Sequence, residues 1–283
     1  MGVRLDLGMA RNLHLAWEMD LEALTRGEKS SETLPYTRIH QQWEDCELGL
    51  WLHETGVRQY EAHDAIHQLV QVHKQFHQKA DALLTQVLAG HHPGAWKNKF
   101  DEVRSLSREI VFLLTAVEFG ALEKQRPIRR ELTQLNPLQN LIKRLFEGPS
   151  RAVEQDQVCL DVSYARLMHM RWSQDLIKSF RHWGQDAHLD SAEICALGVW
   201  IHAVGFKKFS EISEIKMLDK VHKNFHEKAE KTIRELQKKH ADDAQRAYNE
   251  TLELSQEVIY LLSLIEYKLL NLNACTPTVQ VFG

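Results

Sequence analysis

The sequence predicts an all-α protein built from two tandem four-helix-bundle-type domains that are related by internal duplication. Its 283 residues include only 6 Pro and 13 Gly, the two residue types that most strongly interrupt helices. Apolar residues recur every three to four positions over long segments, which is the spacing of one helical face. Several motifs of the first half return in the second half at a nearly constant distance, which indicates a repeat.

Composition and charge narrow the class of protein further. Hydrophobic residues make up 43% and charged residues 26% of the chain, as in folded globular proteins. The formal net charge is −4, without the basic excess of a nucleic-acid-binding protein, so we expect no nucleic-acid partner. No run approaches the length of an apolar membrane helix, and the N-terminus lacks a signal-peptide core, so we expect no membrane span. Four Cys make no disulfide framework and predict a cytoplasmic, reducing compartment.

The first domain is predicted over residues 1–124. Its helical periodicity is clearest in Val57–Ala89 and Phe100–Phe119, which contain neither Pro nor Gly. Breaks are expected in the segments Gly27–Pro35 and Gly90–Pro93, where Gly and Pro cluster. Four antiparallel helices with short connections would then form the first bundle.

The second domain is predicted over residues 161–272, with a strong helical pattern in Tyr248–Leu272. Residues 125–160 are expected to link the two domains and to contain a short helix near Leu138–Phe146, where apolar residues again recur at helical spacing. Residues 273–283 are expected to form a loose tail.

The repeat is defined by blocks of matching residues. Two blocks recur 149 positions later without a gap: Cys46–His53 as Cys195–His202, and His73–Ala80 as His222–Ala229. Upstream, the His-x-x-Trp motif recurs at an offset of 155, and downstream a Ser-x-Glu run recurs at 148: His14/Trp17 as His169/Trp172, and Ser107–Leu114 as Ser255–Leu262. The chain is therefore interpreted as a tandem duplication, in which the first copy carries six extra residues, expected in the Gly27–Pro35 loop.

Each copy contains the residues of one metal site. A His lies on the first helix, a Cys on the second, and a His-x-x-x-His pair on the third, where a spacing of four places both rings on one face. One thiolate and three imidazoles form a closed tetrahedral set that suits Zn²⁺. We therefore expect two zinc ions per chain. The predicted ligands are His14, Cys46, His73 and His77 in the first copy, and His169, Cys195, His222 and His226 in the second.

The duplication also separates these ligands from the other His among the 16 in the chain. Only His53 and His202 also recur in register, and an α-helical rise places each about 10 Å from the Cys of its copy, too far to ligate the same ion. A polar contact in the core or at an interface is the default interpretation of this pair. A contact behind the metal ligands or with a partner protein is the alternative.

Small and aromatic residues surround the predicted ligands. Gly49 and Gly198 follow the Cys by three positions and are expected to let a neighbouring helix or ring approach closely. Four Trp are expected to pack in the core and to exclude water from the metal: Trp17, Trp51, Trp172 and Trp200.

These motifs resemble the chemoreceptor zinc-binding domain of bacterial signalling proteins, present twice. The resemblance rests on His14/Trp17, Cys46–Trp51 and His73–His77, and on the matching motifs at His169/Trp172, Cys195–Trp200 and His222–His226. It implies a helical bundle that binds one zinc ion through three His and one Cys, and that controls a chemoreceptor signalling region or a diguanylate cyclase. It also implies pairing of the bundles, here either within the chain or as a homodimer. The chain contains no recognisable output module, so we expect the partner to be a separate protein.

Three functions follow as hypotheses. The first is a regulatory sensor that responds to zinc or to thiol oxidants, and the second is a purely structural, zinc-stabilised adaptor. The third is a haemerythrin-like di-iron protein, which would need carboxylate ligands such as Glu18 and Glu44. The second copy has Ser173 at the Glu18 position, which disfavours the iron site. Four protein ligands leave zinc no open position, so we expect no enzymatic activity.

Overall fold

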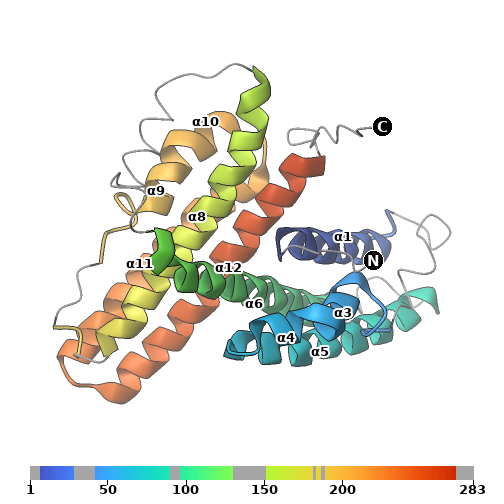
Figure 1. Cartoon of the computed structure of the whole chain (residues 1–283), viewed down its shortest axis with the longest axis horizontal. Helices are drawn as coiled ribbons and strands as arrows, with labels where there is room; N and C mark the ends of the chain where they lie inside the picture. The colour runs from blue at the N-terminus through green and yellow to red at the C-terminus, as the bar shows by residue number, and fades with distance from the viewer. Residues whose placement is uncertain are drawn as a thin grey trace. The chain divides into compact units, whose positions relative to one another are not determined.

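The computed structural model describes residues 7–28, 42–89, 96–129, 151–180, 183–185 and 189–271. Within these ranges the secondary structure is helical and no strand occurs, so the all-α prediction is confirmed. The chain divides into two compact units, Met1–Lys124 and Gln125–Gly283 (Figure 1). We call them unit 1 and unit 2. None of the described helices is apolar enough over a sufficient length to cross a bilayer.

Both units run through corresponding elements in the same order. The elements of unit 1 are α1 (Leu7–Thr25), α3 (Glu47–Trp51), the π-helical turn η1 (Leu52–Gly56), α4 (Val57–Tyr60), α5 (Asp64–Leu88) and α6 (Lys97–Arg129). The elements of unit 2 are α8 (Arg151–Ser179), α9 (Ala196–Trp200), the π-helical turn η4 (Ile201–Gly205), α10 (Phe206–Lys208), α11 (Ser213–Gln237) and α12 (Ala241–Asn271).

The second helical segment of unit 1 differs from the prediction. The continuous helix expected over Val57–Ala89 is wrong, because α4 ends at Tyr60 and His63 adopts an extended backbone (φ −111°, ψ 115°) before α5 begins at Asp64. The acidic side chain of Asp64 then stands in the first turn of α5, where its negative charge interacts favourably with the helix dipole. Neither the break nor the π-helical turn involves Pro, and this is why composition did not reveal them.

The helices flanking the unit boundary extend into the expected linker. Helix α6 continues to Arg129 and α8 begins at Arg151, so both ends of the 125–160 segment are helical. The short helix expected near Leu138–Phe146 and the tail 273–283 lie outside the described residues.

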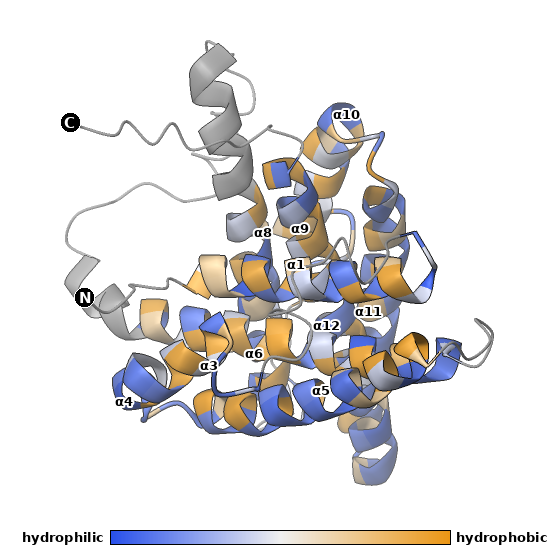
Figure 2. Cartoon of the chain, turned by 90° about the vertical axis from the view of Figure 1, so that its right-hand side faces the viewer, coloured by the Kyte–Doolittle hydropathy of each residue, from blue (hydrophilic) through white to orange (hydrophobic). Residues whose placement is uncertain are grey.

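Each unit has its own apolar core. Hydrophilic and hydrophobic residues alternate along the helical ribbons, as amphipathic packing requires (Figure 2). In α5 the residues Ile66, Leu69 and Leu83 are completely buried, and burial of each such side chain contributes roughly 1.5–3 kcal/mol. This spacing puts the predicted metal ligands of α5 on the same inward face as the core residues.

A buried ion pair joins the first and last helices of each unit. Arg11 Nη1 lies 2.7 Å from Glu118 Oε2, and Arg166 Nη1 lies 2.8 Å from Glu266 Oε2. Both arginine side chains are almost fully buried. The two pairs occupy matching positions of the repeat, so they fix the same helices against each other in both units.

Candidate metal centres

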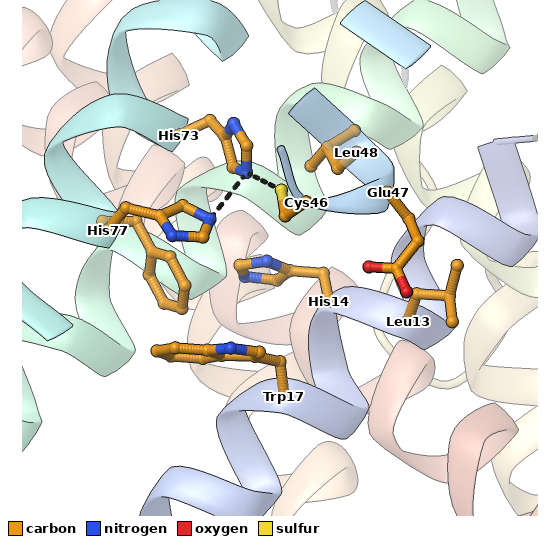
Figure 3. A pocket seen from close by; sticks show the side chains of 9 residues that line it. Leu13, His14, Trp17, Cys46, Glu47, Leu48, His73 and His77 are labelled. Atoms are coloured by element: carbon orange, nitrogen blue, oxygen red, sulfur yellow. Dashed lines mark hydrogen bonds between the residues drawn. The ribbon is translucent and has the colours of Figure 1, made fainter. Parts of the chain in front are cut away.

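The structure brings three of the four predicted ligands of unit 1 into one close group. The candidate ligand atoms of Cys46, His73 and His77 all lie within 4.8 Å of one another, and all three residues are buried. Cys46 Sγ is 3.2 Å from His73 Nε2, and His77 Nε2 is 3.1 Å from the same nitrogen (Figure 3). We call this group, together with His14, site 1.

Helix geometry explains the convergence of the two imidazoles. His73 and His77 stand one turn apart on α5, so their rings project from the same face. Their ring centroids are 4.7 Å apart and their planes are nearly perpendicular. This arrangement directs both Nε2 atoms toward the start of α3, where the sulfur lies.

Cys46 is the N-cap residue of α3 and does not lie inside the helix. Its sulfur accepts a hydrogen bond from the backbone N–H of Gly49 at 3.2 Å. A Cβ atom at Gly49 would stand 1.8 Å from the backbone carbonyl oxygen of Trp43. The predicted close approach at this glycine is therefore real, but its partner is the preceding turn of the chain rather than a neighbouring helix or ring.

The chemistry and spacing of these atoms fit a zinc ion. In a tetrahedral site with Zn–N near 2.0–2.1 Å and Zn–S near 2.3 Å, neighbouring ligand atoms stand roughly 3.3–3.6 Å apart. The 3.1 and 3.2 Å separations in site 1 are only slightly shorter. The cavity between the side chains has a volume of about 30 Å³, which is enough for a single ion.

His14 lines the same cavity but is not a member of the close group. It approaches from α1, the third element of the site (Figure 3). Its ring packs on Phe76, with ring centroids 4.5 Å apart. Its Nε2 is 3.0 Å from the hydroxyl of Ser107 on α6. With Nε2 occupied by this contact, Nδ1 is the ring nitrogen left for a metal.

Unit 2 repeats this geometry in what we call site 2. The ligand atoms of Cys195, His222 and His226 form the corresponding group within 4.8 Å. Cys195 Sγ is 3.2 Å from His222 Nε2, and His226 Nε2 is 3.1 Å from that nitrogen. His169 lines the adjoining cavity and contacts Ser255 Oγ at 3.0 Å. This cavity measures about 170 Å³ and extends to surface residues such as Asp190.

The backbone holds the sulfur of site 2 in the same way. Cys195 caps α9 and accepts a hydrogen bond from the N–H of Gly198 at 3.3 Å. A Cβ atom at Gly198 would stand 1.8 Å from the carbonyl oxygen of Ala192. The N–H groups at a helix start favour a negatively charged sulfur, which is the form that binds zinc.

Burial sets the protonation of the ligands. It raises the pKa of Cys46 and of Cys195 to about 11, although the N–H groups of Gly49 and Gly198 oppose the shift. Burial also lowers the pKa of His14 to about 3 and that of His73 to about 2. The imidazoles are therefore neutral near pH 7 and ready to bind a metal, whereas each thiol must lose its proton.

The same cause acts in site 2. Burial lowers the pKa of His169 well below its usual value, that of His222 to about 3 and that of His226 to about 4. The backbone carbonyl of Asp190 accepts a hydrogen bond from His226 and partly opposes the shift. This bond also fixes the orientation of the imidazole ring.

The four Trp predicted near the metal fall into two pairs. Trp17 and Trp172 border the cavities and pack on Phe76 and Phe225, with ring centroids 5.1 and 4.9 Å apart. They contact the outer ligand His as well. Trp51 and Trp200 are buried in the apolar cores and do not line these cavities. Only the first pair is therefore placed to keep water from a metal.

A core position for His53 and His202 is wrong, and a contact at an interface stays a prediction. Both side chains are exposed. The His53 ring lies 5.0 Å from Trp43, and His202 Nε2 lies 3.4 Å from Asp219 Oδ1. Both stand on π-helical turns, so the straight α-helical stripe that ran from the Cys to these His does not hold.

Residues 14–84 match the family model of the chemoreceptor zinc-binding domain. The matched segment starts at His14 and includes Cys46, His73 and His77. The chain contains a chemoreceptor zinc-binding domain. No curated protein and no solved structure matches the chain. The zinc-binding character of site 1 therefore rests on the domain family together with the convergent Cys and His ligand atoms.

Four residues to which the sequence patterns assigned no role support the two metal sites from behind. Ser107 and Ser255 each contact the first-helix His, and they matched each other in the repeat without being given a role. Arg11 and Arg166 match at the same offset as the two His. Extending the comparison of the copies to every polar residue on the first and last helices would have found these four.

Proposed function

We propose that the chain is a zinc-binding regulatory protein with two sites, each formed by three His and one Cys. The observation that supports this most directly is the convergence of one buried Cys and two buried His in each unit, with a third His lining the same cavity. Each set comes from three separate helical segments, so binding of one ion fastens them together. Its role is regulation rather than catalysis, because four protein ligands fill a tetrahedral shell.

The signal would be a change in zinc level or the presence of a thiol oxidant. Loss of zinc would release α1, α3 and α5 from one another in unit 1. A peroxide would transfer one oxygen atom to the Cys46 or Cys195 sulfur, giving a sulfenic acid and hydroxide, and the oxidised sulfur would bind zinc less well. Either event would loosen the bundle and alter a surface that a partner recognises.

The output would lie in a separate signalling protein of the chemoreceptor or diguanylate cyclase type. This part of the proposal rests on the family, whose description names chemoreceptors. The bundles would pair either within the chain or between two chains, and sedimentation of the zinc-loaded protein distinguishes a monomer from a dimer. The cytoplasmic compartment stays a prediction from the cysteine content.

Metal analysis of the purified chain tests the proposal. We expect two zinc ions per native chain, one in Cys46→Ala and one in Cys195→Ala. A native chain with one zinc ion or none would overturn the two-site proposal. The matched control is Ile194→Ala. Ile194 is exposed and precedes Cys195, so this variant should retain both zinc ions.

A purely structural adaptor is the second candidate, and the small cavity of site 1 favours it for that site. His14, Cys46 and His73 are at most 7% exposed, and the cavity between the ligands measures only about 30 Å³, so we expect slow access of a chelator to the ion. Zinc exchange measured with a chromogenic chelator separates the candidates. A sensor would exchange zinc on the timescale of signalling, and an adaptor would retain it throughout.

The di-iron alternative has little support from the geometry. Glu18, the carboxylate that it needs, is hydrogen-bonded to Ser107 and lies 3.5 Å from Arg104, and it is not part of the close ligand group. An iron absorption band in the purified protein would restore this alternative.

A further inference from the structure

The His on the first helix of unit 1 is connected to a buried carboxylate. His14 Nε2 is 3.0 Å from Ser107 Oγ, and Ser107 donates its hydroxyl proton to Glu18 Oε2. A hydroxyl has only one proton, so Ser107 must accept the proton of His14 Nε2. We call this chain of hydrogen bonds from His14 through Ser107 to Glu18 the relay. It places the imidazole proton on Nε2 and leaves the lone pair on Nδ1.

Glu18 is buried in the protein interior beside a cation. Its side chain is 0% exposed, and Arg104 Nε lies 3.5 Å from its Oε1. Arg104 also binds Glu22 at 2.5 Å, which anchors the guanidinium between the two carboxylates. Arg104 partly offsets the charge of Glu18, but burial keeps solvent from screening its effect on the His14–Ser107 pair.

The corresponding relay in unit 2 ends on neutral groups. His169 Nε2 is 3.0 Å from Ser255 Oγ, which lies 3.2 Å from Ser173 Oγ. Ser173 donates its own proton to the backbone carbonyl of His169 at 3.0 Å. Ser255 therefore donates to Ser173 and accepts from His169. The tautomer is the same as in unit 1, but among the described residues this chain of hydrogen bonds reaches no carboxylate.

The rest of the unit 1 arrangement is also missing from the repeat. Leu252 occupies the position of Arg104, and Ile177 occupies the position of Glu22. Site 2 does have acidic residues near its other ligands, namely Asp190, Glu193 and Asp219. Asp190 and Glu193 are exposed, and Asp219 pairs with Lys223 at 2.8 Å, so solvent and a cation screen their charges.

We propose that Glu18 is a positioning residue that acts through Ser107 on His14 and makes site 1 bind zinc more tightly than site 2. A hydrogen bond from a ligating imidazole toward a carboxylate raises the basicity of the ring and holds its orientation. The inference rests on the proposed zinc-binding function and assigns different tasks to the two sites. Site 1 keeps its ion, whereas site 2, with its larger and more open cavity, fills and empties as zinc changes.

Chains with a single site make the two affinities measurable. The Cys195→Ala chain retains site 1 and the Cys46→Ala chain retains site 2. Competition with a chelator of known affinity should show tighter zinc binding by the chain with site 1. Within that chain, Glu18→Ser, which introduces the residue of unit 2, should weaken binding about 10–100-fold. Glu18→Gln keeps an acceptor for Ser107 without the charge and should cause an intermediate loss.

Two controls separate positioning from a general effect on folding. Glu18→Ser in the Cys46→Ala chain should leave the zinc affinity of site 2 unchanged. The reciprocal double substitution Ser173→Glu with Leu252→Arg in that same chain supplies both the carboxylate and its cation, and should tighten zinc binding by site 2. Cobalt(II) absorption bands report whether the sulfur still ligates in every variant, and thermal melting of the zinc-free chains reports folding.

The outcomes are distinguishable. Equal zinc affinities of the two single-site chains, or an unchanged affinity of site 1 in Glu18→Gln and Glu18→Ser, would overturn the inference while leaving two zinc sites in place. A chain that binds no zinc at all would instead contradict the proposed function. If Glu18→Ser lowers the melting temperature of the zinc-free chain, the near-isosteric Glu18→Gln provides the decisive comparison.

Discussion

The two units hold the sulfur and the paired imidazoles in the same way but differ in what surrounds them. Cys46 and Cys195 each stand 3.2 Å from the first His of the pair, and each caps a short helix followed by a π-helical turn. The buried Arg–Glu pair between the first and last helices also recurs, with Arg11 and Arg166 as its cations. The repeated features are those that fix the ligands and the bundle around them.

The differences begin one layer behind the ligands. Glu18 is replaced by Ser173, Trp43 by Ala192 and Val70 by Asp219. Trp43 contacts His73 and His53 in unit 1. In unit 2, Asp219 places a carboxylate next to His202. The same ligand set therefore has different surroundings in the two units, so we expect the two sites to bind the same ion with different strength.

Removal of zinc should cause the largest change in either unit. Binding to the folded state alone stabilises by about 4 kcal/mol at a free zinc concentration 1,000-fold above Kd, which shifts the melting temperature of a domain of this size by roughly 10–20 °C or more. We expect calorimetry in excess chelator to show this decrease, with unit 2 losing its stabilisation at lower chelator concentration. An unchanged melting temperature after a chelator has removed both zinc ions would contradict this prediction. The Cys46→Ala and Cys195→Ala chains assign each transition to its unit.

Loss of the buried arginine should have the next largest effect, and its cost in unfolding free energy should differ between the two units. Arg166→Ala leaves Glu266, only 8% exposed, without its cation and should cost about 3–5 kcal/mol. Glu118 is 24% exposed and can recover water, so Arg11→Ala should cost less, about 1–3 kcal/mol. Urea unfolding of the zinc-loaded variants measures both costs. The double variant Arg166→Met with Glu266→Leu should regain most of the loss, and an equal cost at Arg11 would show that exposure does not control the effect.

Substitution of two matched glycines by alanine should change the stability of the two units in opposite directions. A Cβ atom at Gly56 would lie 2.8 Å from the buried ring of Trp51, so Gly56→Ala should cost about 1–3 kcal/mol. At Gly205 the nearest atoms are 3.5 Å away or more, and Gly205→Ala should stabilise by up to about 1 kcal/mol through helix propensity. Thermal melting of the two variants tests this. Gly49→Ala and Gly198→Ala serve as controls, because both meet a carbonyl oxygen at 1.8 Å and should be harmful in either unit.

Periodicity and the repeat predicted most of the helices and the close ligand groups of both sites. A helical face and a His pair four positions apart are local properties, so they can be read without knowledge of the fold. The N-cap position of Cys46, the π-helical turns and the interruption at His63 depend on tertiary packing and left no such pattern. The role of Ser107 depends on the approach of α6 to α1, which the repeat alone does not specify.

Glu18 shows a further limit of reasoning from a repeat. Requiring that residues recur finds what the copies share, and it set Glu18 aside because Ser173 stands at its position. In the structure this mismatch is the clearest difference between the two sites, because the carboxylate reaches a ligand through Ser107. Divergence between copies therefore carries information on function as soon as the contacts of the divergent residue are known.

Proton release on zinc binding should be a smaller effect, and both sites should release a similar number of protons. In site 2 the His pKa values are all lowered by burial, so the rings are neutral near pH 7, whereas the Cys195 thiol with a pKa of about 11 is protonated. Zinc binding by the Cys46→Ala chain should therefore release about one proton, and its affinity should fall tenfold, about 1.4 kcal/mol, for each unit decrease in pH. Calorimetric titration in buffers of different ionisation enthalpy counts the protons. Release of none would mean that the thiol is already ionised, and the same titration of the Cys195→Ala chain shows whether Cys46, with the same raised pKa, behaves alike.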